Sequence, residues 1–225
     1  MSKTTAESVR DAFHYMYPDE LPFLKGLAQS LPADPVIINI GAGAGTSGLA
    51  FLECRNDSIV HTIDITDESS PFGCLQGERV VVEGAGLAHL KGDRWNQHHG
   101  DSKDVGRKWL TKVDMVFVDG DHSYDGCRGD IEIWLKHVKP GGLIIVHDYG
   151  KSELDDHPDG PHPKPWADVD RAVADTMVGK YKQHGRVDSM IVFANEQIDE
   201  QIDEKPTNKP VRKQRTSSVA KRPVG

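Results

Sequence analysis

The sequence predicts an α/β fold built on a doubly wound, mostly parallel sheet. Short apolar runs alternate with helix-like stretches from position 36 onward, and the run Val113–Val118 is apolar at nearly every position. Strands buried on both faces of a parallel sheet have this composition. The glycine-rich segment GAGAGTSG directly follows the first run, where such a sheet needs a tight turn into a helix. With 225 residues and 37% hydrophobic content, the chain can fill one sizeable core.

The elements follow from the apolar periodicity. Residues 1–35 are expected to form one or two amphipathic helices, broken at Tyr17-Pro18, which serve as a lid or an extra layer. Asp19 and Glu20 are placed to cap the second helix. The body of the domain is expected over 36–195. Its helices are expected over 124–138 and 167–178, and its strands at Val36–Ile40, Ile59–Ile65, Asn96–His99, Val113–Val118, Leu143–Val146 and Ser189–Ala194.

The C-terminal segment, residues 196–225, differs in composition from the rest. It begins EQIDEQIDE and continues with Lys, Arg and Pro and few apolar residues, so we expect a disordered charged tail. A solvated tail and a weak contact with nucleic acid or an acidic partner both fit it. The formal net charge of −8 argues against a body that neutralises phosphates, so nucleic acid is not expected as a partner except through this tail.

The compartment and the assembly are constrained by simple features. Cys54, Cys74 and Cys127 are widely spaced and form no C-x-x-C pair, which suggests neither a disulfide framework nor a zinc knuckle. The N-terminus has no apolar signal core, and no window approaches the ~18 apolar residues that span a bilayer. We therefore expect a cytoplasmic protein without a membrane partner. The sequence leaves the oligomeric state open, a homodimer included.

The glycine-rich segment can be read in two registers. From Gly43 it is G-x-G-x-x-G, the dinucleotide pattern, and from Gly41 it is G-x-G-x-G, the pattern of loops that bind S-adenosylmethionine. Both patterns let the backbone turn tightly and approach a ligand. Asp64, at the end of the second strand, suits the ribose hydroxyls of either cofactor. These residues alone therefore leave the cofactor open.

Polar residues after the later strands favour S-adenosylmethionine. The fourth strand ends in Asp119, Gly120, Asp121 and His122, and the fifth ends in His147 and Asp148. The carboxyl ends of parallel strands meet in one crevice, so these groups should converge there with the glycine loop. A nicotinamide enzyme has no need of so many carboxylates, whereas a sulfonium cofactor beside a metal or a base does.

These motifs, in this order over 36–148, resemble the class I S-adenosylmethionine-dependent methyltransferases, which have a Rossmann-like fold. DGDHSYDGCRGDIEIW followed by KPGGLIIVHDY is similar to a branch related to the sugar O-methyltransferases of macrolide and aminocoumarin pathways, and more distantly to catechol O-methyltransferase. The resemblance implies O-methylation of a small molecule. It also implies that Gly41, Gly43 and Gly45 approach the methionine part and that Asp64 holds the ribose.

The resemblance implies further cofactor contacts. Asp101 and Ser102 are expected beside the adenine, and Asp119 is counted among the cofactor-binding residues. Where the family commonly has an acid, two residues before the first glycine, this chain has Asn39. Asn39 can hydrogen-bond the cofactor but brings no charge toward its ammonium group.

Two devices could activate an acceptor hydroxyl. In metal-dependent relatives the fifth strand ends in two adjacent ligands, which correspond here to His147 and Asp148, so Asp119, His147 and Asp148 could hold Mg²⁺ or Mn²⁺. Alternatively, Asp121, His122 or His147 acts directly as the general base. Asp121 could instead be the N-cap of the helix that begins at Tyr124.

Other interpretations remain at this stage. The loop LDDHPDGPHPKP after the fifth strand is either an acceptor-contacting loop or a solvated insertion. A nucleic-acid methyltransferase is disfavoured because the position after the fourth strand reads DGDH rather than the Asn/Asp-Pro-Pro-aromatic motif of enzymes that methylate base amino groups. A non-catalytic cofactor-binding scaffold is the third interpretation, since a fold alone does not fix function.

Overall fold

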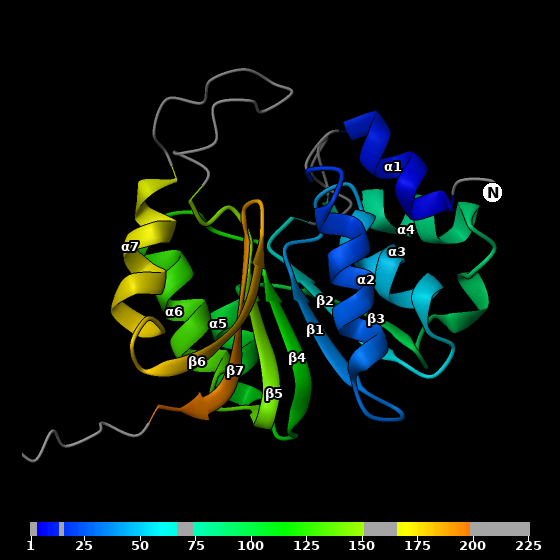
Figure 1. The fold of residues 1–225 in the computed structure, drawn as a ribbon. Coiled ribbons are helices and arrows are strands. Elements are labelled where there is room, and N and C mark those ends of the chain that lie inside the picture. Colours follow the sequence, from blue (N-terminus) through cyan, green and yellow to red (C-terminus); the bar gives the residue numbers. More distant parts are fainter. Residues whose placement is uncertain (1–3, 14–15, 67–73, 151–165, 199–225) are drawn as a thin grey trace, which may run out of the picture.

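The predicted sheet is present in the computed structural model, which describes residues 4–13, 16–66, 74–150 and 166–198 (Figure 1). Its seven strands lie in the order β3-β2-β1-β4-β5-β7-β6. The first five strands along the chain pair in parallel, whereas β7 pairs antiparallel with both β5 and β6. The prediction of a doubly wound, mostly parallel sheet is confirmed. The strands are β1 (Val36–Ile40), β2 (Ile59–Asp64), β3 (Trp95–His99), β4 (Val113–Val118), β5 (Val138–Val146), β6 (Tyr181–Val187) and β7 (Met190–Gln197).

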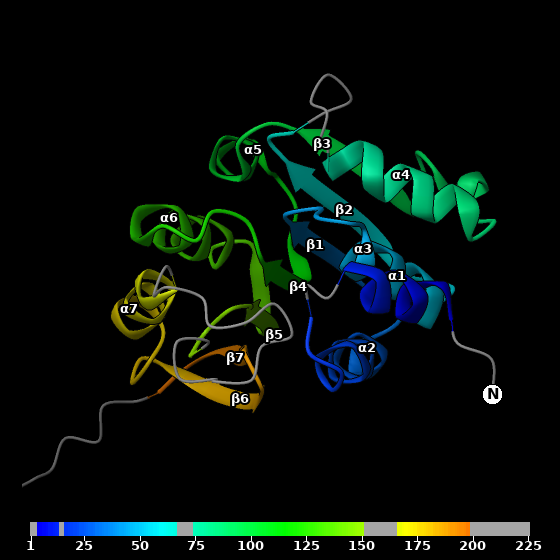
Figure 2. The same cartoon turned by 90° about the horizontal axis from the view of Figure 1, so that it is seen from above.

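Helices cover both faces of this sheet, as the view along its edge shows (Figure 2). One face carries α1 (Thr5–Phe13), α2 (Glu20–Ser30), α3 (Thr46–Cys54), α4 (Cys74–Gly84) and the short 3₁₀ turn η1 (Ala88–Leu90). The other face carries α5 (Ser102–Lys108), α6 (Tyr124–Trp134) and α7 (Ala167–Thr176). None of the helices in the described segments has the length and apolar character that crossing a membrane requires.

The N-terminal helices are part of the main core. Leu21, Leu24 and Leu27 of α2 are buried in the same cluster as Met115 and Phe117 of β4. Of the two roles expected for residues 1–35, this packing is that of an extra layer. Asp19 occupies the N-cap position of α2 but makes no capping hydrogen bond with its side chain among the described residues.

Some boundaries differ from the prediction for local reasons. The segment Lys139-Pro140-Gly141-Gly142 lies inside β5, with a register irregularity against β4, so that strand begins earlier than expected. β6 was not predicted because YKQHGRV has no apolar alternation. It is an edge strand with a largely exposed surface, where polar residues are tolerated. The tail over 199–225 and the loop over 151–165 lie outside the described residues.

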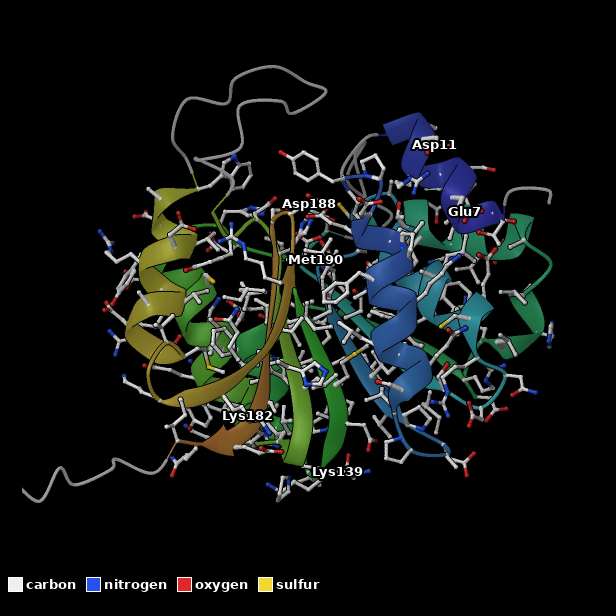
Figure 3. The ribbon with its side chains drawn as sticks, in the orientation of Figure 1. Glu7, Asp11, Lys139, Lys182, Asp188 and Met190 are labelled. Carbon is white, nitrogen blue, oxygen red and sulfur yellow. The ribbon has the colours of Figure 1, made fainter. Side chains whose placement is uncertain are left out.

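The topology brings distant segments to one edge of the sheet. The parallel strands β1, β2, β4 and β5 end there, and the turn between β6 and β7 reaches the same edge. In Figure 3, Asp188 in this turn and Lys139 near the start of β5 lie at opposite ends of the sheet. The hydrogen bond from the Tyr149 backbone N–H to the Ser189 carbonyl joins the turn to the end of β5.

Candidate active site

A cavity of about 470 Å³ lies at the carboxyl ends of the central strands. Because the strands are parallel, each contributes the residues that directly follow its last buried position. Most of the polar residues that the sequence singled out meet here. The lining consists of Ile40, Gly41, Gly43, Ile63, Asp64, Ile65, Cys74, Gly100, Asp101, Ser102, Lys103, Asp119, Gly120, Asp121, His122 and Asp130.

A side chain would have a different effect at each of the three glycines that follow β1. Gly41, at φ +88°, packs against β4, because a Cβ there would collide with the Asp119 carbonyl. Gly45, at φ +85°, lies outside the cavity wall, where a Cβ would collide with Val81 and Glu78 of α4. Only at Gly43, at φ +48°, would a side chain enter open space. Gly43 is therefore the position where the backbone leaves room for a ligand.

Asp64 is held at the cavity wall by backbone donors. Its Oδ2 accepts a hydrogen bond of 2.8 Å from the Ala42 N–H, and its Oδ1 accepts hydrogen bonds from the N–H and hydroxyl of Thr66. These bonds join the end of β2 to the glycine loop and fix the carboxylate. Its position fits the role of a hydrogen-bond acceptor for a ribose.

Asn39 does not reach the cavity, unlike the sequence prediction. Its side chain is fully buried on the opposite face of the sheet, where its Nδ2 donates to the Thr62 hydroxyl at 3.3 Å. The reason is the alternation of side chains along a strand: Ile38 and Ile40 face α5 to α7, so Asn39 must face α3. Asn39 is therefore not among the residues that line the cavity.

Three polar residues form the far wall beyond β3. Asp101 is the N-cap of α5, with its side chain accepting from the Lys103 N–H at 2.7 Å. The hydroxyl of Ser102 donates to the carboxylate of Asp130 on α6. Asp130 is 1% exposed, and burial raises its pKa to about 6. Asp101 and Ser102 thus lie in the cavity wall, together with the buried carboxylate of Asp130, which was not predicted.

A second group of side chains lies beside the first. The Nε2 atom of His122 is 2.7 Å from Asp148 Oδ2 and 3.8 Å from Asp119 Oδ1. The imidazole of His122 therefore faces both carboxylates. One donor atom from each of Asp119, His122 and Asp148 lies within 4.8 Å of the others. We call these three residues the acid–histidine cluster.

The backbone and the charges of the acid–histidine cluster are both unusual. Asp148 has φ +62°, in the left-handed region that few residues with a side chain adopt, as do Asp34 and Asp188 outside the cluster. Burial alone would lower the pKa of His122, but the neighbouring carboxylates of Asp119 and Asp148 outweigh this and raise it to about 9. The two carboxylates therefore favour the protonated imidazole of His122.

His147 occupies a different place from the one predicted. Its side chain is 3% exposed and absent from the cavity wall, and its Nδ1 lies 3.0 Å from Asp119 Oδ1 and its Nε2 3.1 Å from Glu20 Oε2. Burial would lower the pKa of His147, yet the charges of Asp119 and Asp148 raise it well above its usual value. With both ring nitrogens directed at carboxylates, His147 offers no lone pair to a metal or to an acceptor, and His122 stands in the predicted position instead.

Asp121 lines the cavity and is exposed at its mouth. It accepts a hydrogen bond of 2.9 Å from the Ser123 N–H, which lowers its pKa. Ser123, rather than Asp121, caps α6, since its hydroxyl accepts from the Gly126 N–H. The capping alternative for Asp121 is therefore wrong, and the carboxylate is available to the cavity.

Asp130 was not predicted as a buried group and Glu20 was predicted only as a helix cap, although one kind of signal marks both. Asp130 lies between Cys127 and Ile131 on the buried face of α6, and Glu20 precedes Leu24 by four residues on the buried face of α2. An acid at an apolar position of an amphipathic helix becomes buried, and this costs free energy unless the carboxylate has hydrogen-bonding or oppositely charged partners. That conflict between residue type and periodicity marks both residues.

Comparisons with known proteins agree with this geometry. Residues 38–149 match a family model described as a methyltransferase domain. An uncharacterized protein of Acanthamoeba polyphaga mimivirus is 35% identical over 171 residues, which cover 72% of this chain and 70% of that protein. The chain belongs to the class I S-adenosylmethionine-dependent methyltransferases.

Solved structures share the fold of this methyltransferase. An O-methyltransferase from Bacillus cereus in complex with S-adenosylhomocysteine (SAH) aligns with a TM-score of 0.63 at 20% identity, covering 86% of this chain and 91% of that chain. The O-methyltransferase TomG from Streptomyces achromogenes, in complex with S-adenosylmethionine (SAM), aligns with a TM-score of 0.61 at 21% identity, covering 86% and 89%. The cavity described above lies at the carboxyl ends of the parallel strands, where open α/β sheets bind their ligands.

Proposed function

We propose that the protein transfers the methyl group of SAM to a hydroxyl oxygen of a small molecule. The observation that carries the proposal is that Asp119 and His122 belong both to the wall of the cofactor cavity and to the acid–histidine cluster. A hydroxyl that contacts this cluster would lie next to the methyl donor. Methyl transfer requires this alignment of donor and acceptor.

The acid–histidine cluster fits a divalent cation. Two carboxylates and an imidazole are suitable ligands for Mn²⁺ or Mg²⁺, and they leave coordination positions for other ligands. The position of His122 supports this fit, because its Nε2 atom lies 2.7 Å from Asp148 Oδ2 and 3.8 Å from Asp119 Oδ1, so that the three donor atoms are grouped at one point. A cation held by Asp119, His122 and Asp148 would lower the pKa of an acceptor hydroxyl beside it.

The remaining groups account for the proton. The acceptor oxygen forms a bond to the methyl carbon, the carbon–sulfur bond breaks, and its electron pair stays on sulfur as SAH forms. The hydroxyl proton passes to a carboxylate oxygen of Asp121, which is exposed at the cavity mouth, and then to solvent. His147 stays behind Asp119 and takes no part in this transfer.

Several features favour a ring-bearing small molecule as the acceptor. The Trp166 ring lies edge-on to His122, with centroids 4.2 Å apart, so an aromatic surface borders the cluster. The net charge of −8 disfavours a polyanionic acceptor. TomG is described as involved in tomaymycin synthesis. A sugar or natural-product hydroxyl is therefore the acceptor class that we propose.

The test uses SAM with a labelled methyl group and a panel of catechols, phenols and sugars. We expect label in at least one hydroxylated acceptor, loss of transfer with EDTA, and recovery with Mn²⁺ or Mg²⁺. Transfer that is indifferent to EDTA would remove the cation from the proposal while leaving O-methylation in place. Label found only in amines or nucleic acid would overturn the proposal.

A further inference from the structure

A line of buried polar groups runs from the cavity wall into the interior of the protein. Asp119 faces the cavity with 24% of its side chain exposed, and behind it His147 is almost fully buried. On the far side of the ring lies Glu20, whose side chain is 0% exposed. Carboxylate, imidazole and carboxylate therefore follow one another from the cavity inward.

Glu20 is held from several directions. Its Oε1 accepts hydrogen bonds from the N–H of Ser189 at 2.9 Å and from the Ser189 hydroxyl at 2.6 Å. Its Oε2 accepts from the Tyr17 N–H at 2.7 Å and faces His147 Nε2 at 3.1 Å. A buried carboxylate without partners would be strongly unfavourable, so this arrangement has little freedom.

The geometry limits the ring of His147. Rotation of the imidazole would break the contacts with Asp119 and Glu20 together, because they use opposite nitrogens. The Asp119 carboxylate is therefore oriented by a ring that α2 and the β6–β7 turn hold in place. Side chains that orient the groups around a metal or a substrate commonly matter as much as those groups themselves.

We infer that Glu20 and Ser189 are positioning residues for Asp119 and act through His147. The inference rests on the proposed function, because it assumes that Asp119 works at the junction of cofactor cavity and cluster. It adds two residues from outside the methyltransferase match over 38–149 to the machinery of the site. A purely structural role, in which Glu20 only ties α2 to the turn, makes different predictions.

Two variants perturb the line to different extents. Glu20→Gln keeps the size of the side chain but places an amide N–H₂ against donors, either those of Ser189 or that of His147. Ser189→Ala removes the hydroxyl and leaves the backbone N–H bond to Glu20, so it should fold even if Glu20→Gln does not. Asp114→Asn is the matched control, since Asp114 is also a buried carboxylate on β4 but lies at the opposite end, paired with Lys139.

The first readout is the imidazole N–H signals of the full chain, labelled with ¹⁵N at histidine. We expect both variants to shift the Nδ1–H signal of His147, which faces Asp119, although the substitutions lie on the Nε2 side. Asp114→Asn should leave this signal unchanged. An unmoved Nδ1–H signal in folded Glu20→Gln and Ser189→Ala would overturn the inference.

The second readout is binding of Mn²⁺ alone and of SAH alone by calorimetry. Positioning predicts that Glu20→Gln weakens Mn²⁺ binding about tenfold, at the low end of the 10- to 100-fold typical for supporting residues, while SAH affinity stays within a factor of about two. Equal Mn²⁺ affinity in Glu20→Gln and the unaltered protein would count against positioning. If the unaltered protein binds no Mn²⁺, the cation falls from the proposed function, and the Nδ1–H signal alone decides the inference.

Discussion

Asp130→Asn should stabilise the protein near neutral pH, because Asp130 is a buried acid whose charge is poorly compensated. Asn has nearly the same size and can still accept the hydrogen bond from the Ser102 hydroxyl. Burial raises the pKa of Asp130 from 3.8 to about 6, so the folded protein binds this proton more tightly than the unfolded chain. The stabilisation that comes from binding this proton is therefore fully present below pH 3.8, and it is lost as the pH rises through about 6.

The size of the effect follows from the shift. One pKa unit corresponds to about 1.4 kcal/mol, so a shift of about two units makes ionised Asp130 up to about 3 kcal/mol less favourable than the protonated form. Roughly 2 kcal/mol of this should appear between pH 4.5 and pH 7.5. For a domain of this size, a gain of about 3 kcal/mol raises Tm by roughly 6–12 °C.

The assay is urea unfolding of the unaltered protein and of Asp130→Asn at pH 4.5, 6 and 7.5. The difference in unfolding free energy should grow with pH and favour Asp130→Asn at pH 7.5. Asp114→Asn is the control, and it should lower stability at pH 7.5 because it breaks the 2.7 Å ion pair with Lys139. A difference between Asp130→Asn and the unaltered protein that does not change with pH would refute the reasoning.

Three further outcomes are expected. Gly43→Val should abolish SAH binding measured by calorimetry, because the valine side chain would enter the cavity. The control is Gly86→Val, which also places a side chain at a positive φ but in open space elsewhere, and it should bind SAH normally. Equal loss of SAH binding in both variants would show that backbone strain alone is responsible. Asp148→Ala should reduce methyl transfer as strongly as EDTA does and should keep SAH binding. The control Asp104→Ala, on the exposed side of α5, should change neither. Full, EDTA-sensitive activity in Asp148→Ala would contradict a role of the acid–histidine cluster in holding the cation. Deleting residues 199–225 should leave Tm within about 2 °C, because this segment has few apolar residues to bury; a larger drop would show that it packs on the body.

The sequence predicted the parts of the site that depend on strand ends. Gly43, Asp64, Asp119 and Asp148 lie at the ends of buried apolar runs or within three residues of them, and parallel topology brings such positions to one edge. The sheet was equally predictable, because β1 and β4 are buried on both faces and have the matching apolar composition.

The parts that could not be predicted depend on side-chain direction and on distant contacts. Whether His122 or His147 joins the cluster depends on side-chain direction, which no spacing reveals: His122 faces Asp148, whereas His147 extends to Glu20. The link between His147 and Glu20 spans 127 residues, and that between Glu20 and Ser189 spans 169. Local patterns carry no information on such pairs.

The Glu20–Ser189 contact also has a consequence for how the protein matures. A ribosome has already released α2 and most of the sheet before residue 189 emerges, so Glu20 must wait for its partner until synthesis is nearly finished. A contact between such distant residues closes a long loop, and proteins rich in such contacts fold more slowly than those with local contacts. Nascent chains that end before β7 would therefore contain the glycine loop and the acid–histidine cluster while the support behind His147 is still incomplete. The hydrogen bonds that support this edge of the sheet can therefore be completed only near the end of synthesis.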